Sequence, residues 1–183
     1  MIDSLDSLVP EVDEQGNILA SMTRREAHSG TKRLHPVVHL HVFNSRGDLY
    51  LQKRPEWKDI QPGKWDTSVG GHVDLGESVA QALRREVQEE LGITDYEPER
   101  LTHYVFESAK EKELVFVHRT VYDLPITPDK TELADGRFWS QDEIRANIGK
   151  GIFTPNFENE YRQVILPALQ QSHDDKPSTL PLG

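Results

Sequence analysis

Apolar and polar residues alternate along several short segments of this 183-residue chain, and these segments predict its β-strands. In the segment LHPVVHLHVFN, Val38, Leu40 and Val42 fall on one face, opposite His39 and His41. Successive side chains of a strand point to opposite faces, so alternation over this length indicates a strand. Alternation or β-branched, apolar content between turn signals predicts further strands at Leu8–Val12, Ile18–Met22, Leu49–Arg54, Leu114–Asp123 and Gly136–Trp139.

Turn signals divide the chain between these strands. The sequence DEQGN should join the first two strands into a hairpin, and NSRGD should join residues 34–43 to the strand that follows. The polar residues 23–33 are expected to form a connector. The segment that begins at Gly70 is expected to be a loop that leads into a helix.

A helix is predicted from about Ser78 to Leu91, because Ala80, Leu83, Val87 and Leu91 recur at spacings of three and four residues and form one buried stripe. Gly92 suits the position just after the last turn. The sequence SQDE at 140–143 is a capping box that should open a helix to about Ile148, and a last helix should cover roughly 158–170. This order of strands and helices predicts one α/β domain with a mixed sheet.

The last two turns of the first predicted helix carry three carboxylates, Glu86, Glu89 and Glu90, within roughly 100° on the helical wheel. Glu86 and Glu90 repel each other by roughly 0.2–0.5 kcal/mol. Each acid also opposes the negative end of the helix dipole, at roughly 0.3–1 kcal/mol. Arg85 can relieve part of this cost by pairing with Glu89. Either this face is solvated or it holds a cation, and oxygen ligands of this kind suit Mg²⁺ or Mn²⁺.

Composition narrows the class of protein. The formal net charge is −10, so nucleic acids and anionic membranes should be repelled, whereas a small phosphorylated substrate can still bind at a local basic pocket or a metal. There is no cysteine, which excludes disulfides, thiolate nucleophiles and cysteine zinc sites. No secretory signal or membrane span is evident, so a cytoplasmic location is expected.

Gly71, Glu77 and the sequence REVQEELGI at 85–93 fill all nine defined positions of the pattern GX5EX7REUXEEXGU, where U is aliphatic. This pattern is the Nudix box, and the chain resembles the Nudix hydrolase family over roughly residues 34–169. The resemblance implies an α/β/α sandwich with a mixed sheet. The expected organisation is an N-terminal hairpin and connector at 1–33, a Nudix domain at 34–171 and a disordered tail at 172–183.

The same resemblance implies hydrolysis of a diphosphate linkage in a nucleoside diphosphate derivative or related molecule, with Mg²⁺ or Mn²⁺ as cofactor. By carry-over, the metal ligands are Glu86, Glu89, Glu90 and the Gly71 carbonyl. Glu77 and Arg85 would orient the loop and helix through a salt bridge, and Gly92 would be structural. The general base is either a box glutamate, Glu89 or Glu90, or a later acid, for which Glu132 is the candidate. The predicted phosphate contacts are Arg54, Lys58 and Lys64.

A narrower resemblance lies within the first. The sequences AHSGTKRLH, PGKWDTSVGGHVDLGES and EKE are similar to type I isopentenyl-diphosphate isomerases, the branch of the family to which the chain is closest. These enzymes bind a divalent metal through three histidines and two glutamates, and the positions in register here are His28, His35, His72, Glu111 and Glu113. A second metal site is therefore expected.

The isomerase mechanism also needs a cysteine, and the corresponding position is Gly70. A glycine cannot move a proton at carbon, and REVQEE is intact here although the isomerase box is degenerate. The hydrolase interpretation is therefore favoured over an isomerase and over a non-catalytic nucleotide-sensing module. His39 and His41 are expected to be packing or surface residues. The sequence leaves the substrate open, and a homodimer is possible because many relatives form one.

Overall fold

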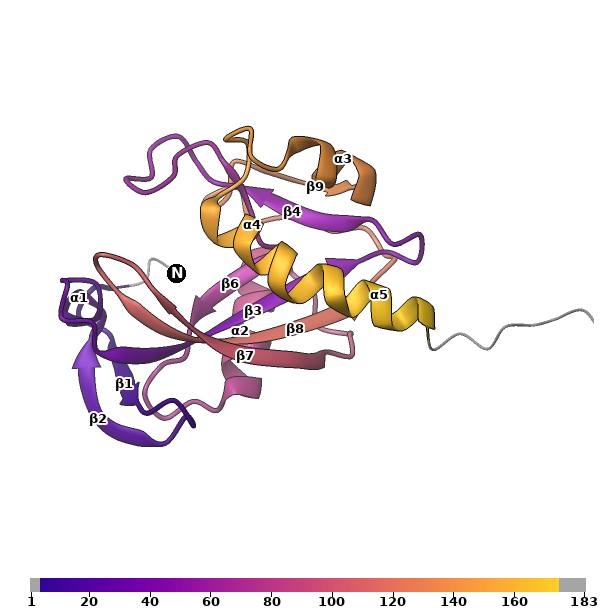
Figure 1. Cartoon of the computed structure of the whole chain (residues 1–183). Coiled ribbons are helices and arrows are strands. Elements are labelled where there is room, and N and C mark those ends of the chain that lie inside the picture. Colours follow the sequence, from indigo (N-terminus) through magenta and orange to yellow (C-terminus); the bar gives the residue numbers. More distant parts are fainter. Residues whose placement is uncertain (1–3, 175–183) are drawn as a thin grey trace, which may run out of the picture.

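A ten-residue strand, β3 (Leu34–Phe43), lies in the middle of the sheet in the computed structural model, which describes residues 4–174 (Figure 1). Seven strands form this sheet, with the main order β5–β4–β3–β8–β7, while β6 pairs with β3 and β9 pairs with β4. The strands β3 and β8 run parallel over their whole length, and every other pair is antiparallel. The predicted mixed sheet is confirmed. The remaining strands are β4 (Leu49–Lys53), β5 (Trp65–Asp66), β6 (Val69–His72), β7 (Glu99–Glu107), β8 (Lys112–Val121) and β9 (Asp135–Trp139).

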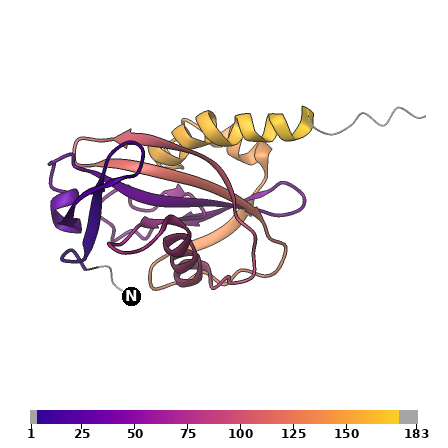
Figure 2. The same cartoon turned by 90° about the horizontal axis from the view of Figure 1, so that it is seen from below.

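Helices cover both faces of the sheet, as Figure 2 shows. On one face α2 (Val79–Leu91) packs Leu83 and Val87 against Val38, Leu40 and Val42 of β3. The other face is covered by a helix that runs through α4 (Pro155–Glu160), the π-helical turn η1 (Tyr161–Ile165) and α5 (Leu166–Asp174). The two faces of β3 are therefore both buried, in the alternation that its sequence predicts, and the α/β/α sandwich is confirmed.

The N-terminal hairpin forms a separate two-stranded sheet of β1 (Leu8–Val12) and β2 (Ile18–Thr23), at the predicted position. Val12 packs against Leu34 and Phe116 of the main sheet. The predicted polar connector contains a short helix, α1 (Arg24–Ala27), because Thr23 and Glu26 form a reciprocal capping box. This turn ends at His28, which it brings close to His35 of β3 and His72 of β6.

Several boundaries differ from the sequence predictions. The predicted Gly70 loop begins inside a strand, β6, whose glycines pair with β3. The nine-residue strand β7 was not predicted, because most of its side chains are exposed and its apolar residues do not alternate regularly with polar ones. The helix α3 (Gln141–Asn147) follows its capping box as predicted. The predicted last helix starts earlier, at Pro155, because Thr154 caps it.

The helix α5 continues to Asp174, into the range for which a disordered tail was predicted, and residues 175–183 of that tail lie outside the described residues. Within residues 4–174, none of the helices has the length and apolar character needed to cross a lipid bilayer.

Candidate active site

A cavity of about 700 Å³ opens between α2, the strands β3, β4 and β6, and the loops around residues 54–58 and 131–133. Most of the predicted site residues line it, namely Arg54, Lys58, Gly71, His72, Glu86, Glu89, Glu90, Glu111, Glu113 and Glu132. Lys64 does not belong to this lining, and its backbone carbonyl instead accepts a hydrogen bond from the Arg54 amide at 2.8 Å. The tertiary structure thus gathers predicted site residues from both halves of the chain and leaves out Lys64, one of the three predicted phosphate contacts.

The helix α2 directs its carboxylates at this cavity because its opposite stripe is fixed in the core. The side-chain oxygen of Ser78 accepts from the Gln81 amide at the N-terminus, and Gly92 adopts a left-handed conformation at the C-terminus, with φ of 67°. Glu86 and Glu90 are 4% and 8% exposed. Gly71 lies so close to the Glu86 carboxylate that a Cβ atom there would collide with it.

Arg85 connects the start of the Nudix-box segment to the glutamate helix. Its Nε and Nη2 atoms donate to the two carboxylate oxygens of Glu77, both at 2.8 Å, which is the predicted salt bridge in bidentate form. Its Nη1 lies 2.8 Å from Glu86 Oε1 and 3.5 Å from Glu89 Oε2. Its Nη2 also donates to the His72 carbonyl at 3.0 Å, so one guanidinium holds strand β6 against α2.

Glu90 is a buried carboxylate in unfavourable surroundings. Burial raises its pKa well above the usual value, and the negative charges of Glu86 and Glu132 raise it further. The Gln52 side chain donates to Glu90 Oε2 at 3.1 Å, which only partly offsets these effects. A divalent cation would stabilise such a group, and Glu86, Glu89, Glu90 and the Gly71 carbonyl, which line the cavity, offer it oxygen ligands. The residues present therefore fit Mg²⁺ or Mn²⁺.

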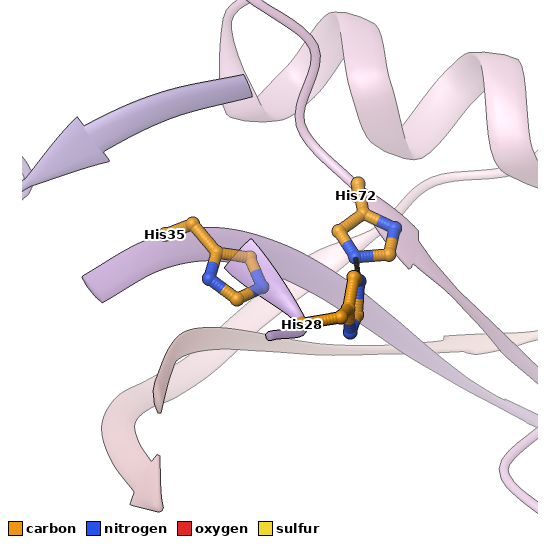
Figure 3. Close-up of side chains that lie close together, drawn as sticks. All are labelled: His28, His35 and His72. Atoms are coloured by element: carbon orange, nitrogen blue, oxygen red, sulfur yellow. Dashed lines mark hydrogen bonds between the residues drawn. The ribbon is translucent and has the colours of Figure 1, made fainter. Parts of the chain in front are cut away.

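A second cluster lies at the end of the cavity, where His28, His35 and His72 converge (Figure 3). The Nε2 atoms of His28 and His72 are 2.9 Å apart, and the three ring centroids are 5.0–5.6 Å from one another. Glu111 approaches His28 Nδ1 at 2.5 Å, and Glu113 lies 3.9 Å from His35 Nε2. All five residues of the predicted second site are therefore brought together.

The electrostatics of this second cluster also fit a metal. Burial lowers the pKa of His35 and, together with the positive charge of Arg24, lowers that of His72 well below its ordinary value. Both rings are then neutral at physiological pH, which is the form that binds metals. His35 is fully buried, and its Nε2 atom has no hydrogen-bond partner among the described residues. Burial and Glu111 raise the pKa of Glu113 to about 7.

Sequence reasoning missed a buried network that joins β3 to α4. His39 and His41 were expected to be packing or surface residues, yet both bond to Glu160 of α4. His41 is fully buried, whereas His39 lines the cavity. Gln52, the partner of Glu90, was missed as well. Two histidines on the same buried face of a strand were the available signal, because such side chains require polar partners.

Comparisons with known proteins agree with this geometry. A family model described as the NUDIX domain matches residues 33–157. An uncharacterized Nudix hydrolase of Listeria monocytogenes is 40% identical over 68% of this chain and 74% of its own length. An isopentenyl-diphosphate Delta-isomerase of Photorhabdus laumondii is 28% identical over 90% of this chain and 96% of its own length. A crystal structure from Deinococcus radiodurans superimposes with a TM-score of 0.73 at 23% identity, covering 85% of this chain and 97% of that one.

Proposed function

Because this chain belongs to the Nudix hydrolase family, we propose that it cleaves the diphosphate linkage of a small molecule, a nucleoside diphosphate derivative or a related compound, in a Mg²⁺-dependent reaction. The observation that carries the proposal is the shared cavity. Three Nudix-box glutamates line it together with the cations Arg54 and Lys58. A diphosphate fits this combination, because its negative charge is stabilised both by a metal, which the glutamates would hold, and by basic side chains.

The proposed division of labour follows from the lining. Glu86, Glu89, Glu90 and the Gly71 carbonyl would hold the cation, for which Mn²⁺ is the alternative. Once bound, Mg²⁺ neutralises charge on the diphosphate and lowers the pKa of the attacking water. Arg54 and Lys58 would bind phosphate oxygens. Water attacks phosphorus, the bridging P–O bond breaks, and the leaving phosphate departs with the bond electrons.

Glu132 is the proposed general base that accepts the proton of the attacking water. It lies on the loop before β9, lines the same cavity as the metal helix, and is close enough to raise the pKa of Glu90. The alternative base is Glu89 or Glu90 itself. In Glu132→Gln, loss of a general base should lower kcat by a factor of about 10²–10⁴ and leave Mg²⁺ affinity unchanged. Loss of metal binding instead would assign Glu132 to the metal site.

The histidine cluster is proposed as a second divalent-metal site, with His28, His35, His72, Glu111 and Glu113 as ligands. The convergence of three rings and the unpartnered Nε2 of His35 support it. Equilibrium dialysis and the visible absorption of added Co²⁺ would test it. His35→Ala should lower the number of metal ions bound per chain by one. The control is His103→Ala, at an exposed position of β7, which should leave this number unchanged. Equal stoichiometry in both variants would contradict the site.

Double-bond isomerisation is not favoured, although the isomerase of Photorhabdus laumondii is similar along most of the chain. Gly70 occupies the position of the cysteine that isomerases need, and the chain has no cysteine. Incubation with isopentenyl diphosphate provides the check, since formation of the dimethylallyl isomer would overturn this assignment.

The decisive experiment is a coupled phosphate-release screen over nucleoside di- and triphosphates, nucleotide sugars and isopentenyl diphosphate, with Mg²⁺ or Mn²⁺. Glu90→Gln is the inactive control. Metal-dependent release that the variant lacks supports the hydrolase and identifies its substrate class. Tight nucleotide binding with no turnover of any compound would favour a sensing module.

A further inference from the structure

Glu160 is a buried carboxylate that collects three donors from two strands. His39 Nδ1 lies 2.9 Å from Oε1, His41 Nε2 lies 2.6 Å from Oε2, and the Tyr104 hydroxyl donates to Oε1 at 2.7 Å. Glu160 is 1% exposed, and it ties α4 to β3 and β7. An ionised carboxylate accepts only, so the Nδ1 atom of His39 must carry the proton.

The two histidines differ in what their second nitrogen meets. His41 is fully buried, and its Nδ1 has no partner among the described residues. His39 keeps 18% of its side chain exposed and lines the cavity. If His39 had only a structural role, its Nδ1 bond to Glu160 would be sufficient. A structural role does not explain why the ring also lines the cavity.

Gly70 is the reason that this edge is open. It pairs directly with His39 in the β3–β6 ladder, and both residues line the cavity. A Cβ atom at Gly70 would lie 3.3 Å from His39 Cδ2 and 3.5 Å from Nε2. Because glycine has no side chain, Gly70 leaves this edge of the imidazole uncovered.

The surroundings favour the protonated ring. Although burial opposes the charge, Glu160 outweighs it and raises the pKa of His39 to about 9, with smaller contributions from Glu113 of β8 and Asp66 of β5. His41 and Tyr104 reach the same carboxylate, and on β8 the charge of His39 helps to lower the pKa of His118, after burial and Arg100. Protonated His39 has a donor on each nitrogen, one bound to Glu160 and one at the cavity.

We infer that His39 is an anion-binding residue of this site, which donates from Nε2 to a phosphate oxygen of the ligand while Glu160 fixes its ring. The inference rests on the proposed function, because it assigns a residue to the binding of that diphosphate. It adds a cationic donor on β3 to Arg54 and Lys58, which line the same cavity from the loop after β4.

Two isosteric variants separate this role from the structural one. In His39→Asn, the amide nitrogen takes the place of Nδ1 and can still donate to Glu160, whereas the cavity-facing nitrogen is gone. In His41→Gln, the amide nitrogen takes the place of Nε2, so the same carboxylate keeps its donor and the cavity is unchanged. The probe is imidodiphosphate, a non-hydrolysable pyrophosphate analogue, titrated calorimetrically with Mg²⁺ present at pH 7.5.

The dissociation constant should rise about tenfold or more in His39→Asn, as expected for a lost charge-assisted hydrogen bond, and stay within about twofold in His41→Gln. In wild-type protein labelled with [15N]histidine, imidodiphosphate should displace the Nε2 resonance of His39, which also keeps the test valid if His39→Asn folds poorly. An unmoved resonance at saturation, equal affinities, or no binding by the wild type would overturn the inference. Since no turnover is needed, a failure of the hydrolase proposal would appear separately, as absent phosphate release.

Discussion

Glu90→Gln should make the metal-free protein more stable and the metal-loaded protein less stable. Glu90 is buried four residues from Glu86 on one helix. At the roughly 6 Å typical of such pairs and an effective dielectric constant of about 20, two charges repel by about 3 kcal/mol. Two effects each reduce this gain in stability by about 1 kcal/mol. Arg85 already pairs with Glu86 and weakens the repulsion, and Gln52 loses a charged acceptor in the variant. The net gain is about 1 kcal/mol, or about 2–4 °C in the melting temperature.

The effect should depend on pH with a defined sign. The pKa of Glu90 is raised in the folded protein, so between pH 4.5 and that raised value the folded state binds more protons than the unfolded state. The stability of the wild type therefore falls as pH rises through this window, whereas Glu90→Gln has no such group to lose. The two melting temperatures should agree at pH 4 and separate at pH 8.

Added Mg²⁺ should reverse the order. A ligand at 100 times its dissociation constant stabilises the folded state by about 2.7 kcal/mol, and only the wild type should gain this. Glu89→Gln is the matched control, because Glu89 is more exposed and pairs with Arg85 at 3.5 Å. This control should change metal-free stability by less than about 0.5 kcal/mol. Differential scanning calorimetry with EDTA and with Mg²⁺ measures both terms, and a destabilised metal-free Glu90→Gln at pH 8 would refute the reasoning.

Three further outcomes are expected. Arg85→Lys should lower the free energy of unfolding by about 2 kcal/mol in urea titrations, because lysine cannot form the bidentate pair with Glu77; an unchanged midpoint would contradict this. Gly71→Ala should weaken Mg²⁺ binding at least tenfold, because the new Cβ would displace the Glu86 carboxylate. Calorimetry measures this, and an affinity equal to that of the wild type would contradict it by showing that the helix can shift. The pKa of His39 rises from 6.5 to about 9, so its stabilisation of up to about 3 kcal/mol should be complete below pH 6.5 and lost as pH rises through 9. Denaturation at pH 6 and pH 10 should show this loss in the wild type and not in His39→Asn.

The elements that the sequence predicted correctly are those with local causes. The α2 helix follows from an apolar stripe, a serine cap and a glycine that accepts a left-handed conformation at its end. The alternation in residues 34–43 fixed the two faces of β3, and the spacing of the Nudix box placed three glutamates on one side of a helix. Each of these signals acts over a few residues, so one sequence is enough to find it.

The elements that were missed have distant causes. The strand β7 pairs with β8 although its own side chains are mostly exposed, and β6 is a strand because β3 supplies partners for two glycines. Hydrogen bonds to a neighbouring strand stabilise such segments, and side-chain pattern carries little trace of them. The position of Lys64 also depends on a distant residue. Its backbone carbonyl accepts a hydrogen bond from the Arg54 amide, and Lys64 does not line the cavity.

The sequence by itself determined the fold class, the family and the placement of three glutamates on one side of a helix, because these depend on residue type and local spacing. Only the tertiary structure decided which side chains share a cavity. Glu160 lies 121 residues from His39 along the chain and 2.9 Å from it in space, and His28 meets His72 across 44 residues. Such contacts arise from the packing of α4 and α1 on the sheet, which no local pattern encodes, and they place His39 and the cluster of His28, His35 and His72 beside the glutamates of the Nudix box.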